Sequence, residues 1–204
     1  MKQTASLWLF TYWNELRNGR KAPNRYEIEP RKIGPLLPET FILETDESRS
    51  FRFRLAGTRI CETYGYELKG LDFVSFWKDR NEREAVESLL HTIKEDGSAG
   101  LLEFTATTDD GESCKFEILL LPLIHAGERV NRIMGSLSPV EEPYWLGSKR
   151  LSAQKLDDLD LIWPDIKPDF SRSENDKLTI SPSGIDRIVS SNGRLFRVID
   201  GGKV

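Results

Sequence analysis

The segment FRLAGTRICETYGYELKG, residues 53–70, holds residue types that could do chemistry. Its cysteine could be a reactive thiol, and Gly57, Gly65 and Gly70 could form a loop that binds phosphate. A phosphate loop, however, follows a Gly-x-Gly-x-x-Gly spacing, or ends in a Lys-Ser or Lys-Thr pair at the start of a helix. The segment has neither pattern. Its glycines therefore predict sharp turns and close backbone packing at a corner between a strand and a helix, because glycine has no side chain to obstruct either.

The cysteines and histidines do not form a recognisable catalytic or metal-binding set. Cys61 and Cys114 are the two cysteines, and their positions give neither a CxxC pair nor a zinc spacing with a histidine. His91 and His125 have no evident carboxylate partners, and no local Ser-His-Asp or Cys-His motif is present. The sequence therefore predicts no catalytic residue, no metal site and no enzyme activity.

Charge and composition limit the classes of partner. The net charge of -4 argues against general nucleic-acid binding, which needs a basic surface to displace counterions from phosphates. The N-terminus lacks the order of a secretory signal, and no apolar run approaches the ~20 residues of a membrane span. We therefore expect a cytoplasmic protein that binds neither nucleic acid nor membrane. One basic stretch is predicted to be a solvated loop, and it contains Arg17, Arg20, Lys21, Arg25, Arg31 and Lys32.

The first apolar segment, residues 5–18, predicts an amphipathic helix that is closed by Gly19. Its apolar side chains form two adjacent stripes, and this arc is wider than one packing contact requires. We therefore expect the helix to lie outside the sheet and to bury a homodimer interface. The predicted interface residues are Trp8, Leu9, Tyr12, Trp13 and Leu16.

The rest of the first 147 residues predicts an α+β fold with an antiparallel five-stranded sheet and helices on one face. In residues 50–56, Phe51, Phe53 and Leu55 alternate with polar side chains, which predicts one buried face. An amphipathic helix is expected over 82–95, with Ala85, Val86, Leu89, Leu90 and Ile93 toward the core. The strands are predicted at 40–45, 50–56, 99–108, 113–124 and 130–138, and short helical pieces at 58–77.

Three regions follow from this pattern. We expect an N-terminal helix and connection over 1–35, a domain core over 36–147, and an extended, partly disordered C-terminal tail over 148–204. The tail is rich in proline and aspartate and has few sustained apolar runs. Truncation after Gly147 is therefore expected to cost little stability.

The element order, together with several motifs, resembles a PAS domain. The segment GYELKG at 65–70 resembles the Gly-Tyr-x-x-x-Gly corner of PAS domains. Further motifs, YWNELRNGR, RLAGTRICETYG, LLLPL, GSLSP and the terminal VIDGG, resemble a bacterial family of single-PAS-domain signalling proteins of largely uncharacterised biochemistry. The resemblance covers roughly residues 7–147 and the tip of the tail. It implies a PAS fold and a role in signal transduction.

The resemblance also raises the question of a cofactor, because PAS domains can hold haem, flavin or a small metabolite. Cys61 lies in RICETYG, which differs from the Asn-Cys-Arg-Phe-Leu-Gln segment of flavin photoreceptors, and it is predicted to be a small apolar residue of the helical cluster. His91 is predicted at the helix surface or the edge of the core. We therefore expect no cofactor.

Two functions remain open at this point. The first is a non-catalytic PAS adaptor or sensor that acts through protein contacts, with its own homodimer and with sensor histidine kinases as partners. The alternative is a small-molecule sensor whose ligand lies between the sheet and the helical cluster. The predicted wall of that pocket is formed by Phe53, Leu55, Ile60, Tyr64, Phe73, Trp77, Leu90, Phe104 and Phe116.

Overall fold

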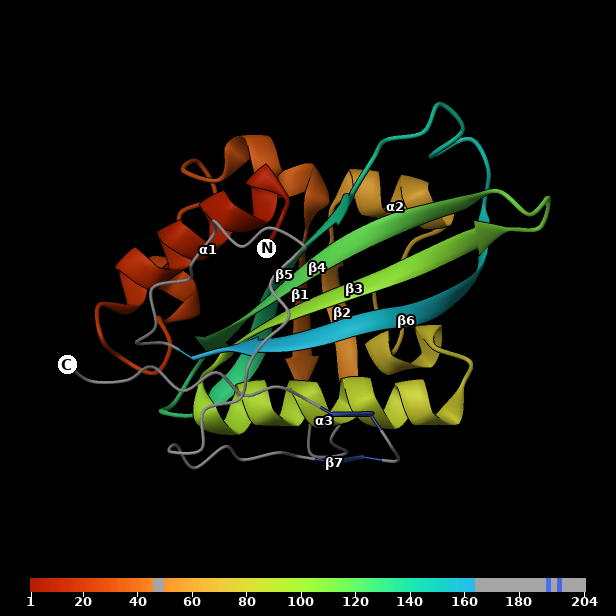
Figure 1. Cartoon of the computed structure of the whole chain (residues 1–204). Coiled ribbons are helices and arrows are strands. Elements are labelled where there is room, and N and C mark those ends of the chain that lie inside the picture. Colours follow the sequence, from red (N-terminus) through yellow and green to blue (C-terminus); the bar gives the residue numbers. More distant parts are fainter. Residues whose placement is uncertain (46–49, 164–189, 192–193, 196–204) are drawn as a thin grey trace.

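The computed structural model describes residues 1–45 and 50–163, and the backbone of residues 190–191 and 194–195 (Figure 1). The helices are α1 (Thr4–Arg17), α2 (Thr58–Tyr64) and α3 (Arg80–Asp96), with 3₁₀-helices η1 (Arg25–Glu27), η2 (Gly34–Glu39) and η3 (Phe73–Phe76). The strands are β1 (Thr40–Thr45), β2 (Phe51–Ala56), β3 (Ala99–Thr108), β4 (Ser113–Ile124), β5 (Val130–Pro139), β6 (Leu151–Ile162), β7 (Ser190–Ser191) and β8 (Arg194–Leu195). The predicted α+β fold and the order of its first elements are confirmed.

The main sheet has six antiparallel strands in the order β2-β1-β5-β4-β3-β6, one more than the sequence predicts. The additional strand, β6, pairs with β3 along its whole length and lies in the segment that we expected to be a tail. Its buried side chains, Leu151, Leu156 and Leu159, are not spaced by two, because the β3–β6 register shifts twice. Because of this irregular spacing, β6 lacks the alternation of apolar and polar residues by which a strand is recognised in a sequence. The rest of the predicted tail lies mostly outside the described residues.

Helix α3 follows the predicted pattern closely. The Asp79 side chain caps its N-terminus by accepting hydrogen bonds from the backbone N–H groups of Asn81 and Glu82. Gly97 ends the helix in the left-handed conformation, with φ 73°, which glycine adopts without strain. The five residues predicted to face the core, from Ala85 to Ile93, are all buried.

The inner face of the sheet packs against α2, η3 and α3. Large aromatic side chains from both layers meet there, and Phe41, Trp77, Phe104 and Phe116 are at most 1% exposed. The last two rings stack with centroids 5.1 Å apart. This aromatic layer forms the main core.

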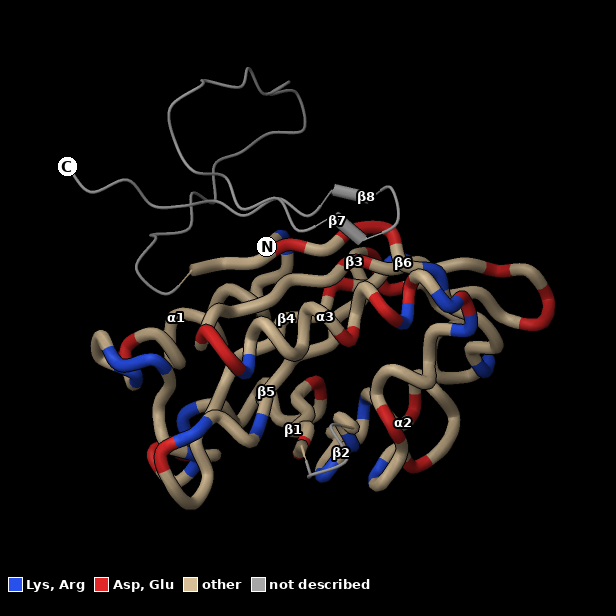
Figure 2. Tube along the Cα trace, turned by 90° about the horizontal axis from the view of Figure 1, so that it is seen from below, with Lys and Arg blue, Asp and Glu red and all other residues tan. Residues whose placement is uncertain are grey.

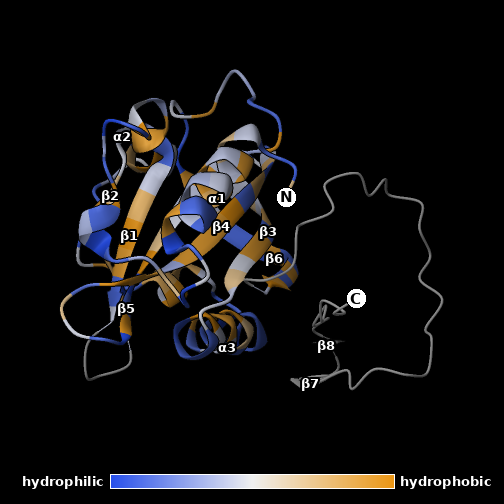
Figure 3. Ribbon diagram, turned by 90° about the vertical axis from the view of Figure 1, so that its left-hand side faces the viewer, coloured by the Kyte–Doolittle hydropathy of each residue, from blue (hydrophilic) through white to orange (hydrophobic). Residues whose placement is uncertain are grey.

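The outer face of the sheet is covered by α1 and the connection that follows it (Figure 3). Leu9 and Trp13 of α1 are fully buried against Leu119, Leu121 and Met134 of β4 and β5. The Trp13 indole Nε1 also donates a hydrogen bond to the Pro122 carbonyl, at 2.8 Å. The sheet is therefore a middle layer with a separate apolar cluster on each side.

Leu55 is placed wrongly by the sequence prediction, since 47% of its surface is exposed. The pairing of β1 with β2 shifts between Ile42 and Leu43, so that Ile42 is opposite Leu55 whereas Leu43 is opposite Phe53. Arg54 is thus an extra residue, and such a bulge reverses the side-chain alternation after it. Phe53 remains inside while Arg54 and Leu55 both face outward.

Candidate ligand-binding site

Most side chains of the predicted pocket wall pack against one another in the interior. Leu55 is exposed, and the other eight are all buried. Their rings make consecutive contacts: centroids lie 5.6 Å apart for Phe53–Phe73, 5.2 Å for Phe73–Trp77 and 6.1 Å for Trp77–Phe104. A chain of rings at these separations is typical of close aromatic packing.

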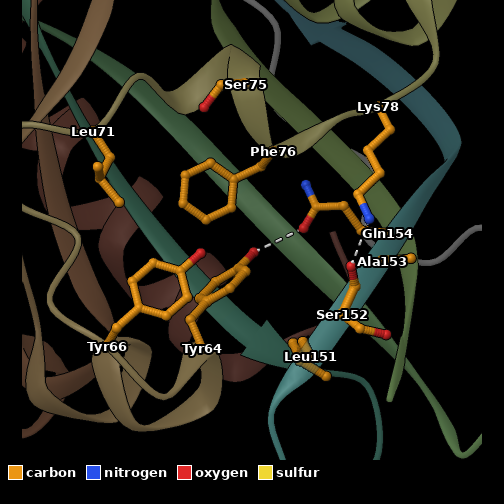
Figure 4. A pocket seen from close by; sticks show the side chains of 10 residues that line it. All are labelled: Tyr64, Tyr66, Leu71, Ser75, Phe76, Lys78, Leu151, Ser152, Ala153 and Gln154. Carbon is orange, nitrogen blue, oxygen red and sulfur yellow. Dashed lines mark hydrogen bonds between the residues drawn. The ribbon is translucent and has the colours of Figure 1, made fainter. Parts of the chain in front are cut away.

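A pocket of about 180 Å³ instead lies beside this core, between the helical cluster and the first half of β6 (Figure 4). Tyr64 is the one residue of the predicted wall that lines it. The other lining residues were not predicted, because β6 was expected to be part of the tail and no strand was expected beside the helical cluster. The lining residues are Tyr64, Tyr66, Leu71, Ser75, Phe76, Lys78, Leu151, Ser152, Ala153 and Gln154.

Tyr64 and Gln154 join the two walls of the pocket. The Tyr64 hydroxyl donates a hydrogen bond to the Gln154 Oε1, at 3.0 Å. Burial raises the pKa of Tyr64, so its hydroxyl stays protonated and remains a donor. The Gln154 Nε2 is buried and has no hydrogen-bond partner within the described part of the chain.

Aromatic rings and cations surround this pair. Phe76 and Tyr66 contact Tyr64 in edge-to-face arrangements, with centroids 5.0 Å and 6.3 Å away. The Arg150 guanidinium lies over the Tyr66 ring at 4.9 Å. The Lys78 Nζ donates to the Ser152 carbonyl at 3.0 Å, which ties the end of the helical cluster to β6. The pocket therefore combines aromatic walls with positive charge.

Neither thiol has the environment of a nucleophile. Burial raises the pKa of Cys61, and its Sγ lies 3.8 Å from the Glu67 carboxylate. Burial, with the nearby Glu141, raises the pKa of Cys114 to about 11. Because the thiolate is the reactive form, both cysteines are expected to be unreactive at neutral pH.

The histidines lie away from the pocket. His91 is half-buried at the edge of the core, as predicted, and its ring contacts Phe51 edge-to-face at 5.2 Å. Its Nε2 does have a carboxylate neighbour, the Glu87 Oε1 one helical turn earlier at 3.8 Å, which the sequence analysis did not expect. His125 lies in the exposed turn before β5.

The residues predicted to form a dimer interface are mostly used within the chain. Leu9, Tyr12 and Trp13 are buried on the outer face of the sheet, and Leu16 is half-buried. Trp8 is 43% exposed, and beside it Leu7 is 37% exposed. The exposed apolar surface of α1 is therefore small, and it lies toward the N-terminal half of the helix.

Three residues of the basic stretch have partners nearby. Arg20 and Glu27 form an ion pair of 2.8 Å, and Lys32 pairs with Glu29 at the same distance. Lys21 donates to the backbone carbonyl of Glu95 at the end of α3. Basic and acidic segments lie close to one another in the part of the chain that follows α1 (Figure 2).

The described part of the chain contains neither a cluster of metal ligands nor a helix that could span a membrane. Within residues 1–45 and 50–163, no group of three or more histidine, cysteine, aspartate or glutamate side chains could hold a metal ion. Among the helices of the same part of the chain, none is long and apolar enough to span a membrane.

Comparison with known proteins gives a consistent picture. No curated protein matches the chain. One similar solved structure is the light-state LOV domain of the blue-light photoreceptor Aureochrome1, with 14% sequence identity and a TM-score of 0.42, covering 56% of this chain and 90% of that chain. A PAS domain from Colwellia psychrerythraea has 12% identity and a TM-score of 0.40, and covers 54% of this chain and 95% of that chain. The PAS domain of an HTR-like protein from Haloarcula marismortui has 19% identity and a TM-score of 0.39, and covers 54% of this chain and 90% of that chain. A family model described as "PAS domain" matches residues 1–138, more than half of the chain. The chain therefore belongs to the PAS domain family.

Proposed function

We propose that this protein is a cytoplasmic, non-catalytic PAS adaptor or sensor in bacterial signal transduction, which acts through contacts with a second copy of itself and with sensor histidine kinases. The observation that carries this proposal is the filled interior beneath the sheet, where Phe104, Phe116 and Trp77 pack ring against ring. A flavin or haem needs a site of several hundred cubic ångströms, within the usual range of about 300–1,000 Å³ for ligand pockets. We therefore expect no flavin or haem beneath the sheet, and we expect the signal to pass through contacts at the surface of the domain.

Trp8 is the residue of α1 that is best placed for such a contact. It is exposed, whereas Leu9 and Trp13 of the same helix attach α1 to the sheet. A partner can therefore bury Trp8 without unpacking the fold. Exposed tryptophans are frequent sources of binding energy in interfaces.

The homodimer is tested by light scattering during gel filtration of the full chain and of Trp8→Glu. We expect a folded dimer for the parent chain and a folded monomer for the variant. Thr11→Glu is the matched control, because Thr11 is also exposed on α1 and its hydroxyl bonds only to the Leu7 carbonyl of its own helix. A monomeric parent chain, or a dimer that Trp8→Glu leaves intact, would refute the self-contact.

The contact with a kinase is tested by the rate at which a purified sensor histidine kinase autophosphorylates, with and without the protein. We expect the rate to change when the parent chain is added and to change less with Trp8→Glu. An absorption spectrum of the same preparation shows whether the protein contains a haem or a flavin. A stoichiometric haem or flavin band would show that the interior opens, and would overturn the adaptor.

A second candidate, a small-molecule sensor, is favoured by one observation. The Gln154 Nε2 is buried beside the pocket without a hydrogen-bond partner among the described residues. Buried polar groups are rarely left unpaired, so a water molecule or the acceptor atom of a ligand is expected to complete the hydrogen bonds of this amide. In this candidate the ligand lies at β6, at the side of the aromatic core.

A further inference from the structure

The pocket beside β6 has a polar side and an apolar side. Figure 4 shows Gln154, Lys78 and Ser152 on one side of it. The opposite side is mostly apolar, with Tyr66, Leu71 and Phe76, and Ser75 lies beside Phe76. A ligand that fits both sides is itself polar at one end and apolar at the other.

Gln154 determines the hydrogen bond that the ligand must make. Its Oε1 is already occupied by the Tyr64 hydroxyl, at 3.0 Å. Its Nε2 is left with two N–H donors and no partner in the described chain. The ligand must therefore offer an acceptor atom at this position.

Lys78 determines the charge of the ligand. Its ammonium group uses one donor on the Ser152 carbonyl, at 3.0 Å, and an ammonium has three. The ten lining residues include no aspartate or glutamate that could neutralise it. The polar end of the ligand is therefore expected to be an anion, and a carboxylate supplies both the charge and the acceptor.

The volume of the pocket limits the size of the ligand. At about 180 Å³ it is smaller than the pockets that hold drug-sized molecules, which begin near 300 Å³. An apolar cavity of about 150 Å³ accepts benzene. The space thus suits one six-membered ring that carries one small acidic group.

We propose that this pocket binds a small aromatic monocarboxylate. Its ring lies against Tyr66 and Phe76, and its carboxylate accepts hydrogen bonds from the Gln154 Nε2 and the Lys78 Nζ. This inference rests on the second candidate function, the small-molecule sensor, and is independent of the contacts of α1. Gln154 belongs to β6, which lies beyond the residues 1–138 that match the family.

The test is a titration of the ¹⁵N-labelled full chain with benzoate, followed by the NMR signals of the Gln154 side-chain amide and of the β6 backbone. We expect saturable shifts at these groups. Benzyl alcohol, which keeps the ring but lacks the carboxylate, should bind at least about tenfold more weakly, since a hydrogen bond to a charged group is worth that much or more.

Two variants assign the contacts. Gln154→Leu keeps the approximate size of the side chain and removes the donor, and Lys78→Gln removes the charge. Each should weaken benzoate binding about tenfold. Lys78→Gln should leave the binding of benzyl alcohol unchanged, because that ligand carries no charge. Lys155→Gln is the matched control, because this exposed lysine is adjacent to Gln154 in β6 but does not line the pocket, and it should bind benzoate as the parent chain does.

Three outcomes would overturn the proposal. The first is the absence of saturable shifts up to about 10 mM benzoate, which is tenfold above a dissociation constant of 1 mM. The second is equal affinity for benzoate and benzyl alcohol, which would show that the carboxylate does not contribute to binding. The third is a loss of binding in Lys155→Gln as large as that in Lys78→Gln, which would indicate non-specific attraction of an anion. The adaptor proposal does not depend on these results, since it is tested separately by the oligomeric state and by the kinase assay.

Discussion

The two faces of the sheet are covered in different ways. On the inner face, aromatic rings such as Trp77 and Phe104 pack against one another with little polar content. On the outer face, α1 is held by a mixture of aromatic and aliphatic packing and by hydrogen bonds at a few fixed points. The fully buried Glu117 carboxylate accepts hydrogen bonds from the backbone N–H groups of Lys2 and Gln3, at 2.6 Å and 3.2 Å.

This difference suggests how each cover contributes. Apolar burial supplies most of the free energy of folding but little direction, whereas a buried hydrogen bond fixes one geometry and contributes less. We therefore expect changes on the inner face to alter global stability strongly. Changes on the outer face should mainly alter how α1 is attached.

The removal of β6 is expected to have the largest effect, because this strand closes one side of the inner core. A chain that ends at Arg150 loses the buried side chains of Leu151, Leu156 and Leu159. Each such burial contributes about 1.5–3 kcal/mol, so the free energy of unfolding should fall by about 4.5–9 kcal/mol. Urea denaturation measures it against a control chain that ends at Trp163 and keeps β6.

That expectation replaces the sequence-based one, in which truncation near Gly147 costs little. If the chains ending at Arg150 and Trp163 differ by less than about 1 kcal/mol, which is the scale of an ordinary point mutation, β6 is not an integral part of the core.

Phe104→Ala should cause the next largest loss, about 3–5 kcal/mol, because it removes a fully buried ring and leaves a cavity. Leu55→Ala is the control, because Leu55 was also predicted to belong to the pocket wall. Since Leu55 is exposed after the bulge in β2, its replacement should change stability by no more than about 0.5 kcal/mol. Equal losses for the two variants would mean that the bulge is absent in solution.

Glu117→Ala should cost about 1–3 kcal/mol, because the backbone N–H groups of Lys2 and Gln3 lose their acceptor. Hydrogen exchange should rise in the first turn of α1 more than in α3. Glu103→Ala is the control, since its ion pair with Lys2 is partly exposed and is worth about 0–1 kcal/mol. Faster exchange throughout the sheet in Glu117→Ala would show instead that α1 and the core unfold together.

The smallest expected effect is the pH dependence of the connection after α1. Hydrogen bonds from Arg20 and from Asn24 lower the pKa of Glu27 from 4.5 to about 2. Because the folded-state pKa is the lower one, Glu27 adds stability above pH 4.5, and this contribution is lost as the pH falls from 4.5 toward 2. The difference in stability between the parent chain and Glu27→Gln should therefore shrink over this range.

Arg20→Gln provides the background that checks the cause. In that variant, the further change Glu27→Gln should have a much weaker pH dependence, because the strongest interaction of the carboxylate is already absent. An unchanged pH dependence would assign the effect to Asn24 rather than to Arg20.

The regular parts of the fold could be predicted from local pattern. Helix α3 has an N-cap aspartate, a C-terminal glycine and an apolar face at helical spacing, and all three act as the sequence indicates. The burial of α1 against the sheet was harder to predict from the sequence than the features of α3. One signal for it was available, since β4 contains the unbroken apolar run ILLLPLI at 118–124, and such a run is typical of a strand that is covered on both faces.

The candidate site could not be predicted in the same way. Leu55 was misplaced because a one-residue bulge leaves no mark on the composition of the strand. Gln154 was missed because its position depends on the pairing of β6 with β3, which are separated by the whole β4–β5 hairpin. The polar, acidic sequence of β6 is equally compatible with a solvated tail, so only its long-range pairing with β3 distinguishes a strand from a tail.

The charged composition of β6 has a consequence for solubility. An open strand edge exposes unpaired backbone groups, which can recruit strands from other molecules. Without β6, that edge would be β3, whose sequence AGLLEFTATT is mostly uncharged. With β6 in place, the edge is a strand in which Lys155, Asp157, Asp158 and Asp160 fall within six consecutive positions. Charged side chains of this kind disfavour edge-to-edge association, so β6 protects the sheet from aggregation as well as completing it.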